Sequence, residues 1–292
     1  MKTFASPRPA RCGFNLIELL VVIAIIAILA SLLMPALIGA KQRANLVKCK
    51  SNQRELAHAW FMFSTDNSDR LVPNGYVTNI TQETKLWVAG ASHKPEASSF
   101  SAETFTNAAD LVNPEYAAFA SYIKSAGVYK CPADRGRLYV STSSGENGDN
   151  ASPELARSYA LNGYLNWTTP AIVDNSYINP LYKIFRKTVD FDSAGIATSD
   201  LMLFIDVAPK YLCHSGFVTR YGTGHYHYPS IEHGGMKGVV SFADGHVDTH
   251  KWLADVTKKS GQDSSFVTMG HYSGSSVDVD LKWLQDHAST LR

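Results

Sequence analysis

The sequence has few of the features that mark an enzyme or a nucleic-acid-binding protein. It contains no Gly-x-Ser-x-Gly elbow, no phosphate-binding loop and no His-Glu-x-x-His pair. Lysine and arginine are scattered over a chain of formal net charge +1, and they form no basic stripe that would follow a nucleic acid. We therefore expect no enzyme activity and no nucleic-acid partner.

Residues 1–12 contain no acidic residue but carry three basic ones, Lys2, Arg8 and Arg11. Glu18 is then the only charged residue up to Ile38. Leu19 to Ile38 is a run of 20 residues; a helix rises about 1.5 Å per residue, so this run spans a hydrocarbon core of roughly 30 Å. A secretory signal is cleaved after its apolar run. Here the predicted processing point, Gly13|Phe14, precedes that run, so the apolar segment should stay on the mature chain.

Residues 8–48 resemble the class III signal of type IV prepilins and type II secretion pseudopilins. The resemblance implies that a membrane-embedded prepilin peptidase cuts after Gly13 and methylates Phe14. It also implies an assembling helix with an acid at Glu18 and a bend at Pro35, where proline removes a helical hydrogen bond. In a helical polymer, Glu18 can pair with the amino group of Phe14 of a neighbouring subunit and set the register. The alternative is a signal anchor whose Glu18 lies among lipid headgroups.

The helical pattern continues beyond the membrane segment. Apolar and small residues recur every three or four positions, which predicts an amphipathic helix: Leu46, Cys49, Gln53, Leu56, Trp60 and Phe63. We predict an α+β fold, in which this long helix packs on a mostly antiparallel sheet. The expected parts are a leader (1–13), a transmembrane and assembly helix (14–38), an amphipathic continuation (39–66) and a globular head (67–292).

The head contains several short strand patterns. Residues 202–207 read as a buried strand and 216–221 as a second one. Residues 239–250 read as a hairpin, because Asp244-Gly245 supplies the positive φ of a tight turn. Residues 251–255 and 279–287 read as short helices.

A second resemblance covers the head. Its blocks are Cys131-Pro132-Ala133-Asp134, residues 158–163, and His233-Gly234-Gly235 leading to Asp244-Gly245. Their order resembles a large prepilin-like family of planctomycete and verrucomicrobial bacteria, marked by a His, nine residues and Asp-Gly. Ten residues separate His233 from Asp244 here, so the spacing differs by one.

Histidines and acids crowd into residues 206–250, and such side chains bind transition metals. The members are Asp206, His225, His227, Glu232, His233, Asp244, His246, Asp248 and His250. The candidate metal ligands are Asp244, His233, His246 and Asp248. The alternative is that these side chains bond to turn backbone or face solvent. Because major pseudopilins bind calcium near the C-terminus, the first resemblance also implies a calcium candidate at Asp244 or in residues 278–280.

The chain has four cysteines, and Cys12 lies in the predicted leader. The remaining three form no disulfide framework. A single bridge between Cys131 and Cys213 stays open in an oxidising compartment, and Cys49 on the long helix reads as a packed thiol. Cys131 and a histidine could also form a nucleophile pair, although Cys131-Pro132 reads better as a buried turn.

The first functional hypothesis is a structural subunit of a type II secretion pseudopilus or a type IV pilus-like filament. Its expected partners are the prepilin peptidase, other pilin or pseudopilin subunits, an inner-membrane assembly platform and membrane lipid. The protein would cross the inner membrane once and hold its head in the periplasm or outside the cell. A second hypothesis is a minor or tip pilin whose head binds polysaccharide or protein. A third is a metal-dependent enzyme on a pilin stalk.

Overall fold

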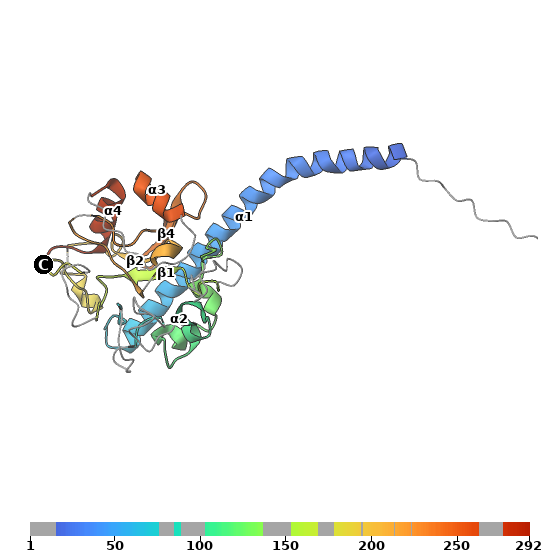
Figure 1. Ribbon diagram of the computed structural model, residues 1–292. Helices are drawn as coiled ribbons and strands as arrows, with labels where there is room; N and C mark the ends of the chain where they lie inside the picture. Colours follow the sequence, from blue (N-terminus) through green and yellow to red (C-terminus); the bar gives the residue numbers. More distant parts are fainter. Residues whose placement is uncertain are drawn as a thin grey trace, which may run out of the picture. The chain divides into compact units, whose positions relative to one another are not determined.

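A computed structural model describes residues 16–75, 85–88, 103–136, 153–168, 178–193, 195–212, 214–222, 224–262 and 277–292. The predicted leader and Phe14 lie outside the described residues. The contacts divide the chain into two compact units, Met1–Ala44 and Asn45–Arg292. The helix α1 (Leu16–Asp66) begins in the first unit and ends in the second (Figure 1).

The part of α1 that belongs to the first unit is almost wholly apolar. Among the described residues, α1 is the one helix long and apolar enough to cross a membrane, judged by length and composition. Pro35 lies inside α1, and the helix continues through it.

The part of α1 in the second unit is amphipathic, as predicted. Cys49, Gln53, Leu56 and Trp60 are fully buried, and their spacing places them on one helical face. Cys49, Leu56 and Trp60 pack in one core cluster with residues of the sheet, including Tyr159. The long helix packed on the head is therefore confirmed.

The sheet has five strands in the order β3-β1-β2-β4-β5. These strands are β1 (Tyr159–Asn162), β2 (Met202–Asp206), β3 (Gly216–Phe217), β4 (Lys237–Phe242) and β5 (Val247–Lys251). Only β1 and β3 pair in parallel, and the other three pairs are antiparallel. The predicted mostly antiparallel sheet is therefore confirmed, although β3 is shorter than the predicted strand at 216–221.

The hairpin of β4 and β5 turns at Asp244-Gly245, as the sequence predicts. Gly245 has φ 90°, a conformation that glycine adopts without the steric cost of a Cβ. The turn fixes the register, in which Ser241 lies opposite Val247 and Lys237 opposite Lys251. Because β5 extends to Lys251, the predicted helix at 251–255 is displaced, and α3 begins at Asp255 instead (Asp255–Gln262).

Helices α3 and α4 (Val279–Ala288) are associated with the second core cluster, which contains Ala160 and Val240 of the sheet and Leu284 of α4. Neighbouring strand residues alternate between the two clusters, since successive side chains of a strand point to opposite faces. Figure 1 shows α3 and α4 together on one side of the sheet. The remaining helical elements are short: α2 (Glu103–Thr106), η1 (Asp110–Val112), η2 (Ala118–Ser121), η3 (Ala126–Tyr129), η4 (Thr188–Asp190) and η5 (Pro209–Tyr211).

Candidate functional site

The apolar part of α1 exposes its side chains on every face. Leu16 exposes 76% of its surface, and Val21, the least exposed of the large apolar side chains up to Ile38, still exposes 48%. A continuous apolar surface of this size needs lipid or other helices around it. Glu18 lies in the first turn of this helix and is its only charged residue before Lys41. The predicted cleavage bond, Gly13|Phe14, lies outside the described residues.

The structure does not bring the predicted metal ligands together. Asp244 and His246 pair with each other at 2.6 Å in the partly exposed turn of the hairpin, and Asp248 pairs with Lys50 at 3.1 Å. His233 forms a bridge with Lys237 at the opposite end of β4. A strand rises about 3.4 Å per residue, so the length of β4 separates His233 from the turn. The four candidate ligands therefore do not form one site, and metal binding by any of them stays a prediction.

The acids near the C-terminus are engaged in helix capping. Asp278 accepts hydrogen bonds from the backbone N–H groups of Asp280 and Leu281 at the start of α4, and its second oxygen pairs with His225 at 2.9 Å. Asp280 accepts from the N–H groups of Leu253 and Ala254. These contacts tie α4 to the segment after β5 and account for both carboxylates without a cation.

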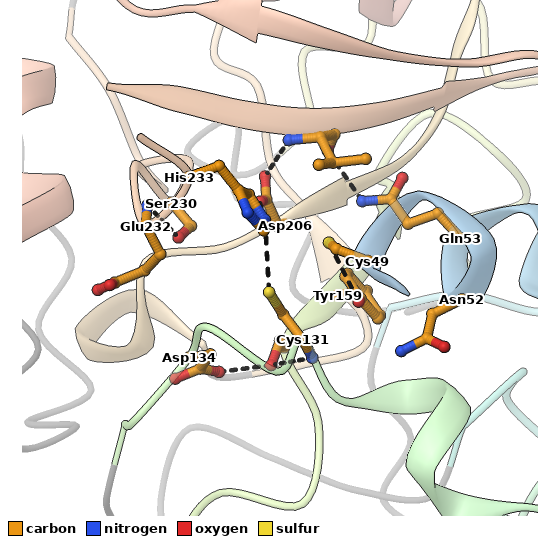
Figure 2. Close-up of polar contacts among 12 residues, drawn as sticks. Cys49, Asn52, Gln53, Cys131, Asp134, Tyr159, Asp206, Ser230, Glu232 and His233 are labelled. Carbon is orange, nitrogen blue, oxygen red and sulfur yellow. Dashed lines mark hydrogen bonds and ion pairs between the residues drawn. The ribbon is translucent and has the colours of Figure 1, made fainter. Parts of the chain in front are cut away.

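His233 instead joins a buried cluster with Cys49, Cys131 and Asp206, whose side chains point toward one another (Figure 2). None of the four residues exposes more than 2% of its surface. The ligand atoms of Cys49, Cys131 and His233 all lie within 4.8 Å of one another. His233 Nε2 lies 3.4 Å from Cys131 Sγ and 3.6 Å from Asp206 Oδ2.

Four separate segments supply this cluster, which we call the thiol cluster. Cys49 comes from α1, Asp206 from the end of β2, Cys131 from the loop after η3, and His233 from the segment before β4. Two buried amides on α1 fix the segments around it. Asn52 donates to the carbonyls of Gly127 and Lys130, and Gln53 donates to the carbonyl of Val239 at 2.8 Å.

The sequence blocks that resemble the second family meet at this cluster. The N–H of Cys131 donates to Ser158 Oγ at 3.0 Å, and Ser158 Oγ in turn donates to Asp134. Asp134 also forms an ion pair with Lys130 Nζ at 2.8 Å. The order of these blocks along the chain marks the resemblance, but it does not predict that Cys49 lies beside them. The only local signal for Cys49 was its place on the buried stripe of α1.

Burial and mutual contact shift the pKa values of the cluster in opposite directions. The hydrogen bond with Cys49 is the main influence that lowers the pKa of Cys131 to about 5, and His233 contributes further. Burial raises the pKa of Cys49 and of Asp206 well above their ordinary values. Burial alone would lower the pKa of His233, but the hydrogen bond with Cys131 and the charge of Asp206 raise it. For Cys131 and His233, the contacts within the cluster therefore outweigh the effect of burial.

This geometry does not suit nucleophilic catalysis. A Cys-His-Asp triad uses one imidazole nitrogen for the thiol and the other for the carboxylate. Here Cys131 and Asp206 both face Nε2, while Nδ1 has no hydrogen-bond partner. The burial of all four residues also leaves no route for a substrate to the Cys131 sulfur. Cys131 is a free thiol, and its predicted disulfide partner, Cys213, lies outside the described residues, so that pairing stays a prediction.

Comparison with known proteins finds one family motif at the N-terminus and several pilin-like relatives. The model of the prokaryotic N-terminal methylation motif matches residues 8–34. The type II secretion system core protein G of Escherichia coli (strain K12) is 34% identical over 104 residues, which cover 35% of this chain and 72% of that protein. The type IV wide pilus major component PilA4 of Thermus thermophilus is 43% identical over 67 residues, which cover 23% of this chain and 47% of that protein.

A further relative is the type II secretion system core protein G of Klebsiella michiganensis. It is 44% identical over 61 residues, covering 21% of this chain and 43% of that protein. The chain thus spans most of the Escherichia coli relative but less than half of the other two. No solved structure gives a significant match.

Proposed function

Because the chain belongs to the type IV pilin and type II secretion pseudopilin family, we propose that it is a structural subunit of a pseudopilus or a type IV pilus-like filament. The observation that carries the proposal is the apolar part of α1, which exposes large side chains on all sides around a single acid. In the membrane, lipid covers this surface. In the filament, the same surface packs against the helices of other subunits.

Glu18 gives the assembly its register in this proposal. A carboxylate costs on the order of 3 kcal/mol at the centre of a membrane helix. The cost is smaller in the first turn, where Glu18 lies, and pairing with a cation removes much of it. Cleavage at Gly13|Phe14 creates an amino group on Phe14, four residues before Glu18. The amine of one subunit then pairs with Glu18 of the next and selects one axial offset among the many that apolar packing alone would allow.

The remaining partners follow from this assembly. A prepilin peptidase in the inner membrane cuts the leader and methylates Phe14, and an assembly platform drives subunits out of the membrane. The head stays in the periplasm or, in a pilus, outside the cell. Its contribution is mechanical and not catalytic.

The Glu18→Ala variant tests the proposal in a host with its own peptidase and assembly machinery. We expect Glu18→Ala to remove the chain from the sheared filament fraction, while the membrane fraction keeps it with a mature N-terminus at methylated Phe14. Glu18→Asp is the matched control, because it keeps the charge and should retain part of the assembly. Filaments of normal amount from Glu18→Ala would refute the register role, and an intact Met1 in the membrane fraction would refute the processing step.

The second candidate function, a minor or tip subunit, is favoured by one feature of the head. A groove is lined on one side by the cations Arg70, Lys85, Arg186 and Lys187, together with polar and aromatic side chains such as Tyr122. Cations gathered in a groove attract acidic ligands, so an acidic polysaccharide or protein surface would suit it. The number of copies of this chain per filament separates the two candidates.

A further inference from the structure

We propose that the head holds a structural transition-metal ion, Zn²⁺ before others, between the sulfurs of Cys49 and Cys131, His233 Nε2 and a carboxylate oxygen of Asp206. This inference concerns the head alone and is independent of the proposed assembly through α1. The proposed ligands differ from the candidate ligands predicted from the sequence, and the two sets share only His233.

Two separations within the thiol cluster match edges of a coordination tetrahedron, and the ligand atoms of Cys49, Cys131 and His233 lie within 4.8 Å of one another. Zinc binds sulfur at about 2.3 Å and nitrogen or oxygen at about 2.0–2.2 Å, which separates a sulfur from a nitrogen ligand by about 3.6 Å and a nitrogen from an oxygen ligand by about 3.4 Å. The observed separations are 3.4 Å from Cys131 Sγ to His233 Nε2 and 3.6 Å from His233 Nε2 to Asp206 Oδ2. A separation of 3.6 Å is too long for a hydrogen bond between His233 and Asp206, whereas it suits two ligands of one ion.

The donor set selects the class of metal. Two thiolates with an imidazole suit zinc and other borderline or soft ions, whereas calcium and magnesium require several oxygen ligands. The cluster offers one carboxylate oxygen beside two sulfurs and a nitrogen. The donor set of the thiol cluster therefore suits zinc and does not suit calcium.

The protein around the cluster supplies the outer contacts that a metal site needs. Tyr159 Oη donates to Cys49 Sγ at 3.2 Å, and the N–H of Val239 donates to Asp206 Oδ1 at 3.0 Å. Each contact orients its ligand and leaves the inner atom directed at the cluster. Asp206 Oδ2 has no hydrogen-bond partner although Asp206 is 1% exposed. A buried carboxylate oxygen of this kind is costly unless a cation lies beside it.

A disulfide between Cys49 and Cys131 is the competing arrangement. A disulfide would involve only the two sulfurs, and it would not account for the burial of His233 and Asp206 beside them. A metal ion uses all four side chains, so the structure favours the metal. The ion would join α1 to the end of β2, to the loop after η3 and to the segment before β4, which no disulfide does.

Metal analysis of the full-length chain in detergent tests the proposal. After equilibration with Zn²⁺ alone and removal of free ion, we expect about one zinc per chain. Replacement of zinc by Co²⁺ should give the visible bands of tetrahedral cobalt together with a near-ultraviolet thiolate-to-cobalt band. Cys131→Ser and His233→Gln should lose the metal, and Asp206→Asn should weaken its binding, because an amide oxygen is a poorer ligand than a carboxylate.

The double variant Asp244→Asn and His246→Gln is the matched control, because it removes the exposed pair of the hairpin turn and should keep the metal. Should the cluster variants fail to fold, the cobalt spectrum of the wild-type chain decides the question. Absence of bound zinc and of the thiolate-to-cobalt band in the folded wild-type chain would overturn the proposal. A mass and alkylation pattern that show a disulfide between Cys49 and Cys131 in the chain purified without reductant and equilibrated with zinc would overturn it equally.

Discussion

At the scale of single residues, the head depends on polar side chains that are buried and paired by long-range contacts. His225 exposes 2% of its surface and pairs with Asp278 at 2.9 Å. Burial lowers the pKa of His225 below its ordinary value, and the pairing with Asp278 offsets only part of that effect. His225 therefore binds a proton more weakly in the folded head than in the unfolded chain.

This difference predicts a loss of stability in mild acid. In the unfolded chain a histidine titrates near pH 6.5. The contribution of His225 to the free energy of unfolding is therefore fully present above that pH. It is lost as the pH falls below it, because the unfolded chain binds the proton more readily than the folded head. We expect the free energy of unfolding in urea to fall less steeply between about pH 7.5 and 5 in His225→Gln than in the wild type. His58→Gln, at an exposed position on α1, controls for the substitution itself. Parallel curves for His225→Gln and the wild type would contradict the prediction.

The residues of the thiol cluster show what sequence patterns can and cannot locate. The buried stripe predicts that Cys49 faces the head, and the crowding of acids and histidines includes Asp206 and His233. Neither pattern predicts that these residues meet, because their approach depends on how α1, β2 and two loops pack. The same crowding predicts Asp244 and His246 as ligands, but the structure places them at the far end of β4 from His233.

At the scale of elements, sequence patterns predict an element correctly where adjacent residues determine it. The apolar run, the amphipathic stripe and the Asp244-Gly245 turn each specify an element from adjacent residues, and α1, β4 and β5 agree with them. The four-residue strand β1 lacks such a signal. It forms because β2 and β3 pair with it on either side, which is tertiary information.

The turn between β4 and β5 gives the clearest test at this scale. Gly245 has a positive φ of 90°, and a Cβ added at this position would lie 3.2 Å from Phe61 Cε2. We expect Gly245→Ala to lower the free energy of unfolding by roughly 1–2 kcal/mol, because an L-residue is strained in this conformation. Gly127→Ala is the control, since its Cβ would make only an ordinary contact at 3.6 Å and should change stability by less than about 0.5 kcal/mol. Equal losses in the two variants, measured in urea, would contradict the account of the turn.

At the scale of the whole molecule, the chain combines an apolar helical unit with a head that folds around its own cores. The head buries both faces of its sheet, whereas the apolar part of α1 exposes its large side chains throughout. A surface of this kind is complete only in lipid or in a polymer of similar helices. This division is that of a pilin-like chain, in which an apolar helix precedes a globular head.

The number of copies of this chain in isolated filaments tests the central claim most directly. Sheared filaments would be quantified by mass spectrometry with isotope-labelled peptides of the head, against the other pilin-like chains in the same fraction. As the main structural subunit, this chain should be present in excess over every other subunit. A few copies per filament would indicate the tip or minor role, and its absence from filaments that assemble normally would contradict the proposal that it is a filament subunit.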